Sequence, residues 1–297
     1  MPGGNFSQWR LLALNASTWS VLSCVFHDGS LSDSSARWVF RDQASIVGQK
    51  LKSIPGNVLP NSSDTFTFAT INDTHVTDMR STSIVGRAVA GISADDRVVF
   101  TVILGDIATD GRLQELSLPK PVFDRLEHPY FTIPGNHDVD MTLDVPMDNY
   151  ERVYKEGNWA EGESGWAFIG LDTTNDTASD VTIGPERMAW LEKQIKRIGN
   201  QRPIALFGHH PFNPNSKAYR VQNADEVLAL FAGHNLKLVA SGHYHGNQIE
   251  ERDGILFTTT ACCSTTRGNH DGTEAKGYRL YHVSEGAIET EFVEVQV

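Results

Sequence analysis

The sequence predicts a layered α/β domain preceded by a small β-rich segment. From Phe66 onward, short apolar runs alternate with helical patterns, which is typical of stacked sheets and helices. Before that point the runs are short and β-prone, and Gly, Pro and Ser separate them. We therefore expect two parts, residues 1–62 and residues 63–297.

The composition is that of a chain that buries a core. The 297 residues are 40% hydrophobic and 21% charged, close to the usual globular range. The formal charge of −12 argues against long nucleic acid or an anionic membrane surface as the main partner. The chain starts with no export-signal pattern and has no apolar run of membrane-spanning length, so we expect a soluble, cytoplasmic protein. A homo-oligomer is left open.

The three cysteines predict neither a disulfide framework nor a structural zinc site. They are Cys24, Cys262 and Cys263, an odd number without a Cys-x-x-Cys pair. We interpret Cys262 and Cys263 as packing residues, since no activating base is evident near them in the sequence.

The expected elements follow from the periodicity of apolar residues. Strands are expected near residues 9–14, 19–26 and 38–40 in the first part, and then at residues 65–71, 98–104, 130–133, 203–207, 236–240, 278–283 and 288–295. One helix is expected to open at Gly184-Pro185, because proline is tolerated at the first helical position. A second helix is expected over residues 224–231.

Five polar motifs stand where five of these strands end. In chain order they are Asp73-Thr74-His75, Gly105-Asp106, Gly135-Asn136-His137-Asp138, Gly208-His209-His210-Pro211 and Gly242-His243-Tyr244-His245. Open α/β sheets bind ligands beyond the carboxyl ends of their strands, so these motifs are expected to meet at one site. The glycines are expected to let the backbone turn tightly before each ligand.

The motifs contain the donors of a metal centre. Imidazole nitrogens with carboxylate oxygens suit borderline divalent cations such as Zn, Mn, Fe, Co or Ni, and one carboxylate can bridge two ions. If His243 and His245 lie on an extended strand, their alternate side chains face one cluster. Each motif by itself is weak, since a Gly-Asp after a strand is most often a turn.

The order and spacing of the five motifs resemble the calcineurin-like metallophosphoesterase family, from about Phe66 to about His245. The resemblance implies a four-layer α/β/β/α sandwich and a centre with two divalent ions, Mn²⁺, Fe²⁺ or Zn²⁺. It assigns Asp73, His75 and His245 to the first ion, with Asp106 shared by both ions. It also assigns Asn136, His209 and His243 to the second ion.

The resemblance further implies the reaction. A hydroxide between the two ions would attack phosphorus in line, and His137 would assist the leaving oxygen. The family's purple acid phosphatases have a tyrosine at the position of Thr109, and its protein phosphatases have an aspartate that orients the catalytic histidine. Thr109 can supply neither group, so what holds His137 is open, with Asp138 as one candidate.

Four further residues are candidate substrate contacts. His210 stands beside the expected ligand His209. Arg267, Asn269 and His270 lie in a loop similar to the one that follows the last metal motif in bacterial family members. The sequence Gly268-Asn269-His270-Asp271 repeats an earlier motif, but it follows no apolar strand, and we interpret it as a non-ligand.

The resulting hypothesis is a metal-dependent phosphodiesterase acting on a small-molecule phosphoester. The absence of the Asp-Arg-Gly sequence of protein phosphatases disfavours a phosphoprotein substrate. Two alternatives stay open. One is a phosphomonoesterase or nucleotidase on the same fold, and the other is a non-catalytic metal-binding scaffold.

Overall fold

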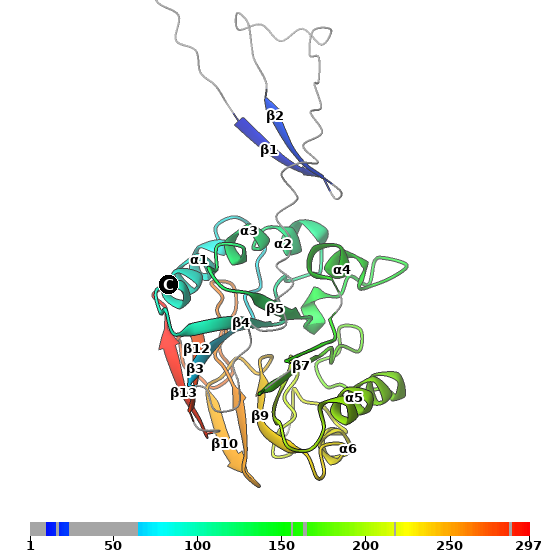
Figure 1. Ribbon diagram of the computed structural model, residues 1–297. Coiled ribbons are helices and arrows are strands. Elements are labelled where there is room, and N and C mark those ends of the chain that lie inside the picture. The colour runs from blue at the N-terminus through cyan, green and yellow to red at the C-terminus, as the bar shows by residue number, and fades with distance from the viewer. Residues whose placement is uncertain are drawn as a thin grey trace, which may run out of the picture. The chain divides into compact units, whose positions relative to one another are not determined.

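The protein is described from a computed structural model (Figure 1). The structure describes residues 10–15, 18–23, 65–155, 157–162, 165–216, 218–284 and 287–297. The chain divides into two compact units, Met1–Ser53 and Ile54–Val297. The predicted boundary at residue 62, the strand at 38–40 and Cys24 lie outside the described residues.

The described residues of the first unit, 10–15 and 18–23, form an antiparallel pair of strands. β1 (Arg10–Asn15) pairs with β2 (Thr18–Ser23), with Leu14 opposite Trp19. The two strands overlap the predicted runs at residues 9–14 and 19–26, with Asn15 and Thr18 lying one residue outside them.

The second unit contains two sheets. The five-stranded sheet has the order β13-β12-β3-β4-β5, and the six-stranded sheet has the order β10-β11-β9-β8-β7-β6. The first comprises β3 (Phe66–Ile71), β4 (Val98–Leu104), β5 (Tyr130–Ile133), β12 (Gly277–Ser284) and β13 (Ala287–Glu294). The second comprises β6 (Trp159–Glu161), β7 (Ala167–Leu171), β8 (Pro203–Gly208), β9 (Asn235–Ser241), β10 (Gln248–Arg252) and β11 (Ile255–Thr259).

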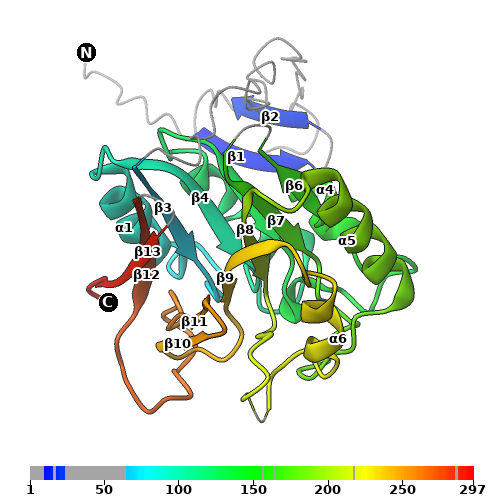
Figure 2. The ribbon, with the colours of Figure 1, turned by 60° about the horizontal axis from the view of Figure 1, so that its bottom comes forward.

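Helices cover the outer faces of both sheets. They are α1 (Thr82–Ser93), α2 (Leu113–Ser117), α3 (Lys120–Phe123), α4 (Asp148–Tyr154), α5 (Pro185–Ile198) and α6 (Ala224–Ala229), with a 3₁₀ turn η1 (Asn136–Asp138). Figure 2 shows α1 on one side of the strands and α5 and α6 on the other. The predicted helices at 184–185 onward and at 224–231 correspond to α5 and α6.

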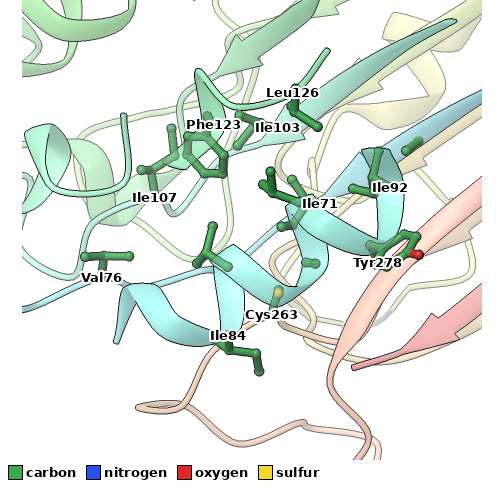
Figure 3. Packing of buried hydrophobic residues seen from close by; sticks show 14 of the residues in the cluster. Ile71, Val76, Ile84, Ile92, Ile103, Ile107, Phe123, Leu126, Cys263 and Tyr278 are labelled. Atoms are coloured by element: carbon green, nitrogen blue, oxygen red, sulfur yellow. The ribbon is translucent and has the colours of Figure 1, made fainter. Parts of the chain in front are cut away.

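Three apolar layers hold this arrangement together. Side chains of α1 pack on β3 and β4, as Figure 3 shows for Ile92, Ile71 and Ile103. A second layer lies between the six-stranded sheet and α5 and α6. The third lies between the two sheets, where the Phe68 ring stacks on Phe100 and Tyr281 at centroid distances of 5.0 and 4.7 Å. The order of layers is helix, sheet, sheet, helix, which confirms the predicted four-layer α/β/β/α sandwich.

The central strands read as continuous apolar runs because both of their faces are covered. All six residues of β3 are buried, and so are all six of β8. In the five-stranded sheet β3, β4 and β5 run parallel, and in the six-stranded sheet β7, β8 and β9 run parallel. The carboxyl ends of these strands therefore lie at one edge of each sheet. This edge is where the five polar motifs begin.

No helix in the described part of the chain combines the length and apolar character that crossing a membrane requires.

Candidate metal centre

Two groups of buried side chains converge beyond the carboxyl ends of the strands. Asp73, His75, Asp106 and His245 form the first group, and Asp106, His209 and His243 form the second, with the donor atoms of each group within 4.8 Å of one another. Both groups contain Asp106. The two sheets supply different residues. The strands β3 and β4 of the five-stranded sheet lead into the two aspartates and His75, and β8 and β9 of the six-stranded sheet lead into the other three histidines.

Short distances join the donor atoms. In the first group, His245 Nε2 lies 3.2 Å from Asp73 Oδ1, and His75 Nε2 lies 3.3 Å from His245 Nε2. In the second group, His209 Nε2 lies 3.2 Å from both Asp106 Oδ1 and His243 Nδ1. Such a set of imidazole and carboxylate donors suits a divalent transition-metal ion.

Backbone carbonyls determine which ring nitrogen faces each group. His209 Nδ1 lies 2.7 Å from Leu104 O, His243 Nε2 lies 2.8 Å from Ser179 O, and His245 Nδ1 lies 3.0 Å from Gly268 O. A carbonyl oxygen only accepts, so each of these nitrogens carries a hydrogen, and the opposite nitrogen of the neutral ring carries a lone pair. When the three rings are neutral, their inward lone pairs face buried carboxylates, an arrangement that a bound cation stabilises.

A buried polar atom supports the same interpretation. Asn136 Oδ1 has no hydrogen-bond partner among the described residues. A buried acceptor without a partner costs free energy, and metal coordination by Asn136 Oδ1 would remove that cost. The donor types and the unpartnered oxygen thus fit divalent ions.

The charges of the two groups perturb the pKa values of their members. Burial opposes the charged form of His245, but Asp73 outweighs this effect and raises the pKa of His245 to about 11. Asp106 likewise outweighs burial and raises the pKa of His209 to about 9. Burial lowers the pKa of His75 to about 3 and, together with His209, that of His243 to about 4. Without metal, protons take the place of positive ions beside the two aspartates.

Five of the residues in the two groups have a left-handed backbone. The φ angles are 52° for Asp73, 42° for His75, 51° for Asp106, 63° for His243 and 49° for His245. This conformation is strained for residues that carry a Cβ, and such strain concentrates at functional sites. The side chains meet because the backbone turns sharply at the ligands themselves.

Two details of the predicted convergence are therefore wrong. The strand β9 ends at Ser241, so His243 and His245 do not share one face of a strand; positive φ at each residue directs them into different groups. Of the four preceding glycines, only Gly105 has a positive φ, of 82°. The others lack room for a Cβ, which at Gly135 would lie 2.1 Å from Asp106 Oδ1.

His137 lies beside the first group. Its ring is 4.8 Å from the His75 ring, and its backbone N–H donates to Asp106 Oδ1 at 2.9 Å. Its Nδ1 lies 2.6 Å from Thr109 O, so Nδ1 donates and Nε2 is available for proton transfer. The residue that holds His137 is thus Thr109, through its backbone rather than its side chain.

Asp138 has other partners than His137. Its Oδ1 accepts the Ala108 N–H at 2.8 Å and its Oδ2 accepts the Gly135 N–H at 2.9 Å. These bonds join the loops that follow β4 and β5. Burial and the nearby charge of Asp106 raise the pKa of Asp138 to about 7.

A cavity of about 400 Å³ opens onto these groups, and we call it the metal-site cavity. His75, Asp106, Asn136, His243 and His245 line it, together with His137. Arg267, Asn269 and His270, predicted as substrate contacts, also line it. The donors of the two groups do not include His270 or Asp271 of the Gly268–Asp271 sequence.

The structure does not bring His210 to the cavity. His210 is buried, its Nδ1 lies 2.7 Å from Thr173 Oγ1, and its Nε2 lies 3.1 Å from Ala178 O. Both ring nitrogens are therefore engaged inside the protein. The expectation that His210 contacts substrate is corrected to a supporting position behind His209 and His243, whose rings are 5.0 and 4.3 Å away.

Sequence reasoning missed two residues at the site and gave a third no role. Ser179 and Tyr219 line the metal-site cavity from loops and carry no local signal. Asn72, which directly follows a buried strand, is expected at the site from the sequence, but its role comes from the structure. It is buried and donates to Asp73 Oδ2 at 2.5 Å and to Thr260 O at 3.0 Å.

Comparison with known proteins decides the family. Residues 66–247 match the calcineurin-like phosphoesterase family. The chain belongs to this family. The match covers all five motifs and agrees with the resemblance that the motifs indicated.

Two relatives of this calcineurin-like phosphoesterase have curated names. A probable glycerophosphodiester phosphodiesterase GpdQ of Arcobacter nitrofigilis is 29% identical over 180 residues, which cover 56% of the chain and 62% of the relative. A probable cyclic nucleotide phosphodiesterase of Xenorhabdus bovienii is 26% identical over 171 residues, which cover 56% of the chain and 67% of the relative. The chain thus spans about three fifths to two thirds of these proteins.

Among solved structures, the purple acid phosphatase PPD1 of yellow lupin (Lupinus luteus) has a TM-score of 0.62 at 10% identity. The alignment covers 80% of the calcineurin-like phosphoesterase and 52% of the lupin chain. This likeness concerns the fold.

Proposed function

We propose that the chain hydrolyses phosphodiesters with two divalent metal ions, Mn²⁺, Fe²⁺ or Zn²⁺. One observation carries the proposal. Backbone carbonyls fix three imidazoles so that their lone pairs point at two buried aspartates, one of which belongs to both groups of donors. The family and the names of its relatives support phosphodiesters as the substrate class.

The ligands are assigned by group. Asp73, His75 and His245 would hold the first ion, Asp106 both ions, and Asn136, His209 and His243 the second. When bound, a pair of such ions supplies positive charge for the phosphate oxygens and hydroxide as the nucleophile. Asn72, which donates to Asp73, would orient a ligand.

Side chains of the protein would then donate the proton to the leaving group and position the residues around the substrate. Hydrolysis forms a P–O bond to the oxygen of water and breaks the P–O bond to the leaving alcohol. His137 in its doubly protonated form would give the leaving oxygen the proton on Nε2, while its Nδ1–H stays hydrogen-bonded to Thr109 O; the ring then remains as the neutral Nδ1–H tautomer. Asp138 would act as a positioning residue for the loop that carries Asn136 and His137.

The cavity supports a small substrate. A volume of about 400 Å³ accommodates a small phosphoester, and Arg267 and His270 on its wall would contact it. We also propose that residues 63–297 form the catalytic domain, with residues 1–62 as a separate β-rich segment.

The test compares two chromogenic esters after reconstitution with Mn²⁺ or Zn²⁺. We expect a higher kcat/KM on bis-(p-nitrophenyl) phosphate than on p-nitrophenyl phosphate. A much higher kcat/KM on the monoester would favour the phosphomonoesterase or nucleotidase alternative. A protein that retains fewer than one ion and stays inert with both metals would favour the non-catalytic scaffold.

A further inference from the structure

A second and larger cavity lies next to the metal-site cavity. Its volume is about 530 Å³, within the range of ligand pockets, and we call it the outer cavity. It is built from the ends of β9 and β11, the edge strand β10, and the segment between β8 and α6. That segment lies beside β10 (Figure 2), and it is joined to β10 by hydrogen bonds from Asn213 and Asn215 to Glu250.

Tyr219 is the wall between the two cavities, because it lines both of them. Its ring lies 5.6 Å from that of His243 and stacks on His270 at 5.2 Å with an interplanar angle of 15°. On the other side, Tyr244 lines the outer cavity 6.5 Å from the Tyr219 ring. The two cavities therefore adjoin at Tyr219, and a substituent that passes beside its ring would enter the outer cavity.

The outer cavity lies at the end of the site that faces away from His137. His137 contacts the ring of His75, whereas Tyr219 contacts the ring of His243. His75 and His243 belong to different donor groups. If the leaving oxygen faces His137, the retained ester substituent is the one that is free to extend sideways toward Tyr219.

Glu250 carries the formal charge of the described wall of the outer cavity. It is the only Asp, Glu, Lys or Arg among the described residues that line the cavity. Asn213 Nδ2 donates to Glu250 Oε2 at 2.6 Å, and Asn215 donates to Oε1. Two neutral amides orient the carboxylate without cancelling its charge, and about two of its four acceptor positions remain free.

We propose that the outer cavity binds the retained substituent of the phosphodiester and that Glu250 selects a substituent bearing a compact ammonium group. A carboxylate with the aromatic faces of Tyr219 and Tyr244 is a combination that attracts amino and quaternary ammonium cations. The proposal rests on the proposed function, since it assigns a substrate class to the same site.

The test uses p-nitrophenyl phosphocholine and p-nitrophenyl ethyl phosphate, which release the same phenolate and differ only in the retained group. We expect the wild-type protein to prefer the choline ester by about tenfold or more in kcat/KM, which corresponds to about 1.4 kcal/mol. Glu250→Gln is expected to abolish that preference and leave the ethyl ester within about twofold. Glu251→Gln is the matched control, because successive side chains of β10 point to opposite faces.

Three results would overturn the proposal. The first is an equal loss of kcat/KM on both esters in Glu250→Gln. The second is no preference for the choline ester in the wild-type protein. The third is a Glu250-dependent preference for thymidine 5′-p-nitrophenyl phosphate over the choline ester.

Binding of phosphocholine and ethyl phosphate, measured by calorimetry, separates this proposal from the proposed function. Glu250-dependent binding of phosphocholine without hydrolysis of any ester would retain the cation site and reject the phosphodiesterase. Hydrolysis of both esters at equal rates would retain the phosphodiesterase and reject the cation site.

Discussion

The Nδ1 atom of His137 lies 2.6 Å from the carbonyl oxygen of Thr109. This contact fixes the ring tautomer through the main chain, so that the side chain at position 109 is not needed for it. From this contact we predict that His137 acts as the acid that protonates the leaving oxygen.

His137→Ala is expected to keep its metal and to lose about 10²–10⁴ in kcat on a diester with an alkyl leaving group. The loss should be much smaller with p-nitrophenolate, a leaving group that needs little protonation. Thr109→Ala is the control, because it keeps the carbonyl and loses only the hydrogen bond from its Oγ1 to His75 O. Equal losses of His137→Ala on both leaving groups would show that His137 does not act as the acid.

Asn136→Ala is expected to weaken the binding of one of two ions by at least about tenfold, which is 1.4 kcal/mol. Asn136 lines the metal-site cavity with an unpartnered Oδ1, and the proposal assigns it to the second ion, so the ion at Asp73, His75 and His245 should keep its affinity. Calorimetric titration with Mn²⁺ measures both affinities. His270→Ala, which changes the cavity wall outside both groups, should leave both unchanged. Equal weakening at the two sites would contradict the assignment.

Metal binding is expected to release about two protons near pH 7.5, because ligand nitrogens must be deprotonated to coordinate. Without metal, His209 and His245 have pKa values of about 9 and 11, so both rings are protonated at that pH. His75 and His243, at about 3 and 4, are already neutral. The affinity for metal should therefore rise as pH rises toward 9. Calorimetry in buffers of different ionisation enthalpy counts the protons, and a count near zero would contradict the charge balance described above.

Gly135→Ala is expected to abolish metal binding and activity. A Cβ at this position would lie 2.1 Å from Asp106 Oδ1 and 2.4 Å from Asp106 N, so the shared carboxylate must move. Gly86→Ala in α1 is the matched control, since its Cβ would meet nothing closer than 3.9 Å. That variant should gain about 0.5–1 kcal/mol of stability from its better helix propensity. Metal analysis and thermal unfolding measure both effects, and a fully loaded Gly135→Ala protein would refute the steric argument.

The sequence was sufficient to predict the layers and the residues of the two groups. The strands at 98–104 and 130–133 have the predicted bounds, because their apolar runs stop at Gly105 and at Pro134-Gly135, where the chain turns. The motifs were informative because they follow such runs. The helix α1 was not predicted individually, since Gly86 and Gly91 interrupt its pattern. Gly91 is needed there because a Cβ would lie 2.8 Å from Tyr278 Oη.

Features that depend on distant parts of the chain were not predictable. The partner of His137 is a backbone atom, and no side-chain pattern reports a backbone contact. Positive φ at His243 and His245 arises from the turn after β9 and leaves no signal in their His-x-His spacing. Tyr219 reaches the site from a loop that is 24 residues from His243, and its neighbours in sequence do not mark it as a wall residue.

The proposed ligands come from both sheets of the sandwich. Asp73, His75, Asp106 and Asn136 follow strands of the five-stranded sheet, and the remaining histidines follow strands of the six-stranded sheet. Bound ions would therefore act as noncovalent cross-links at one end of the interface between the sheets. Their binding free energy, RT ln(1 + [M]/Kd) for each site, would add to the cohesion of the two halves. Chelation would accordingly remove more than the nucleophile, because it would also loosen the end of the sandwich at which substrate enters.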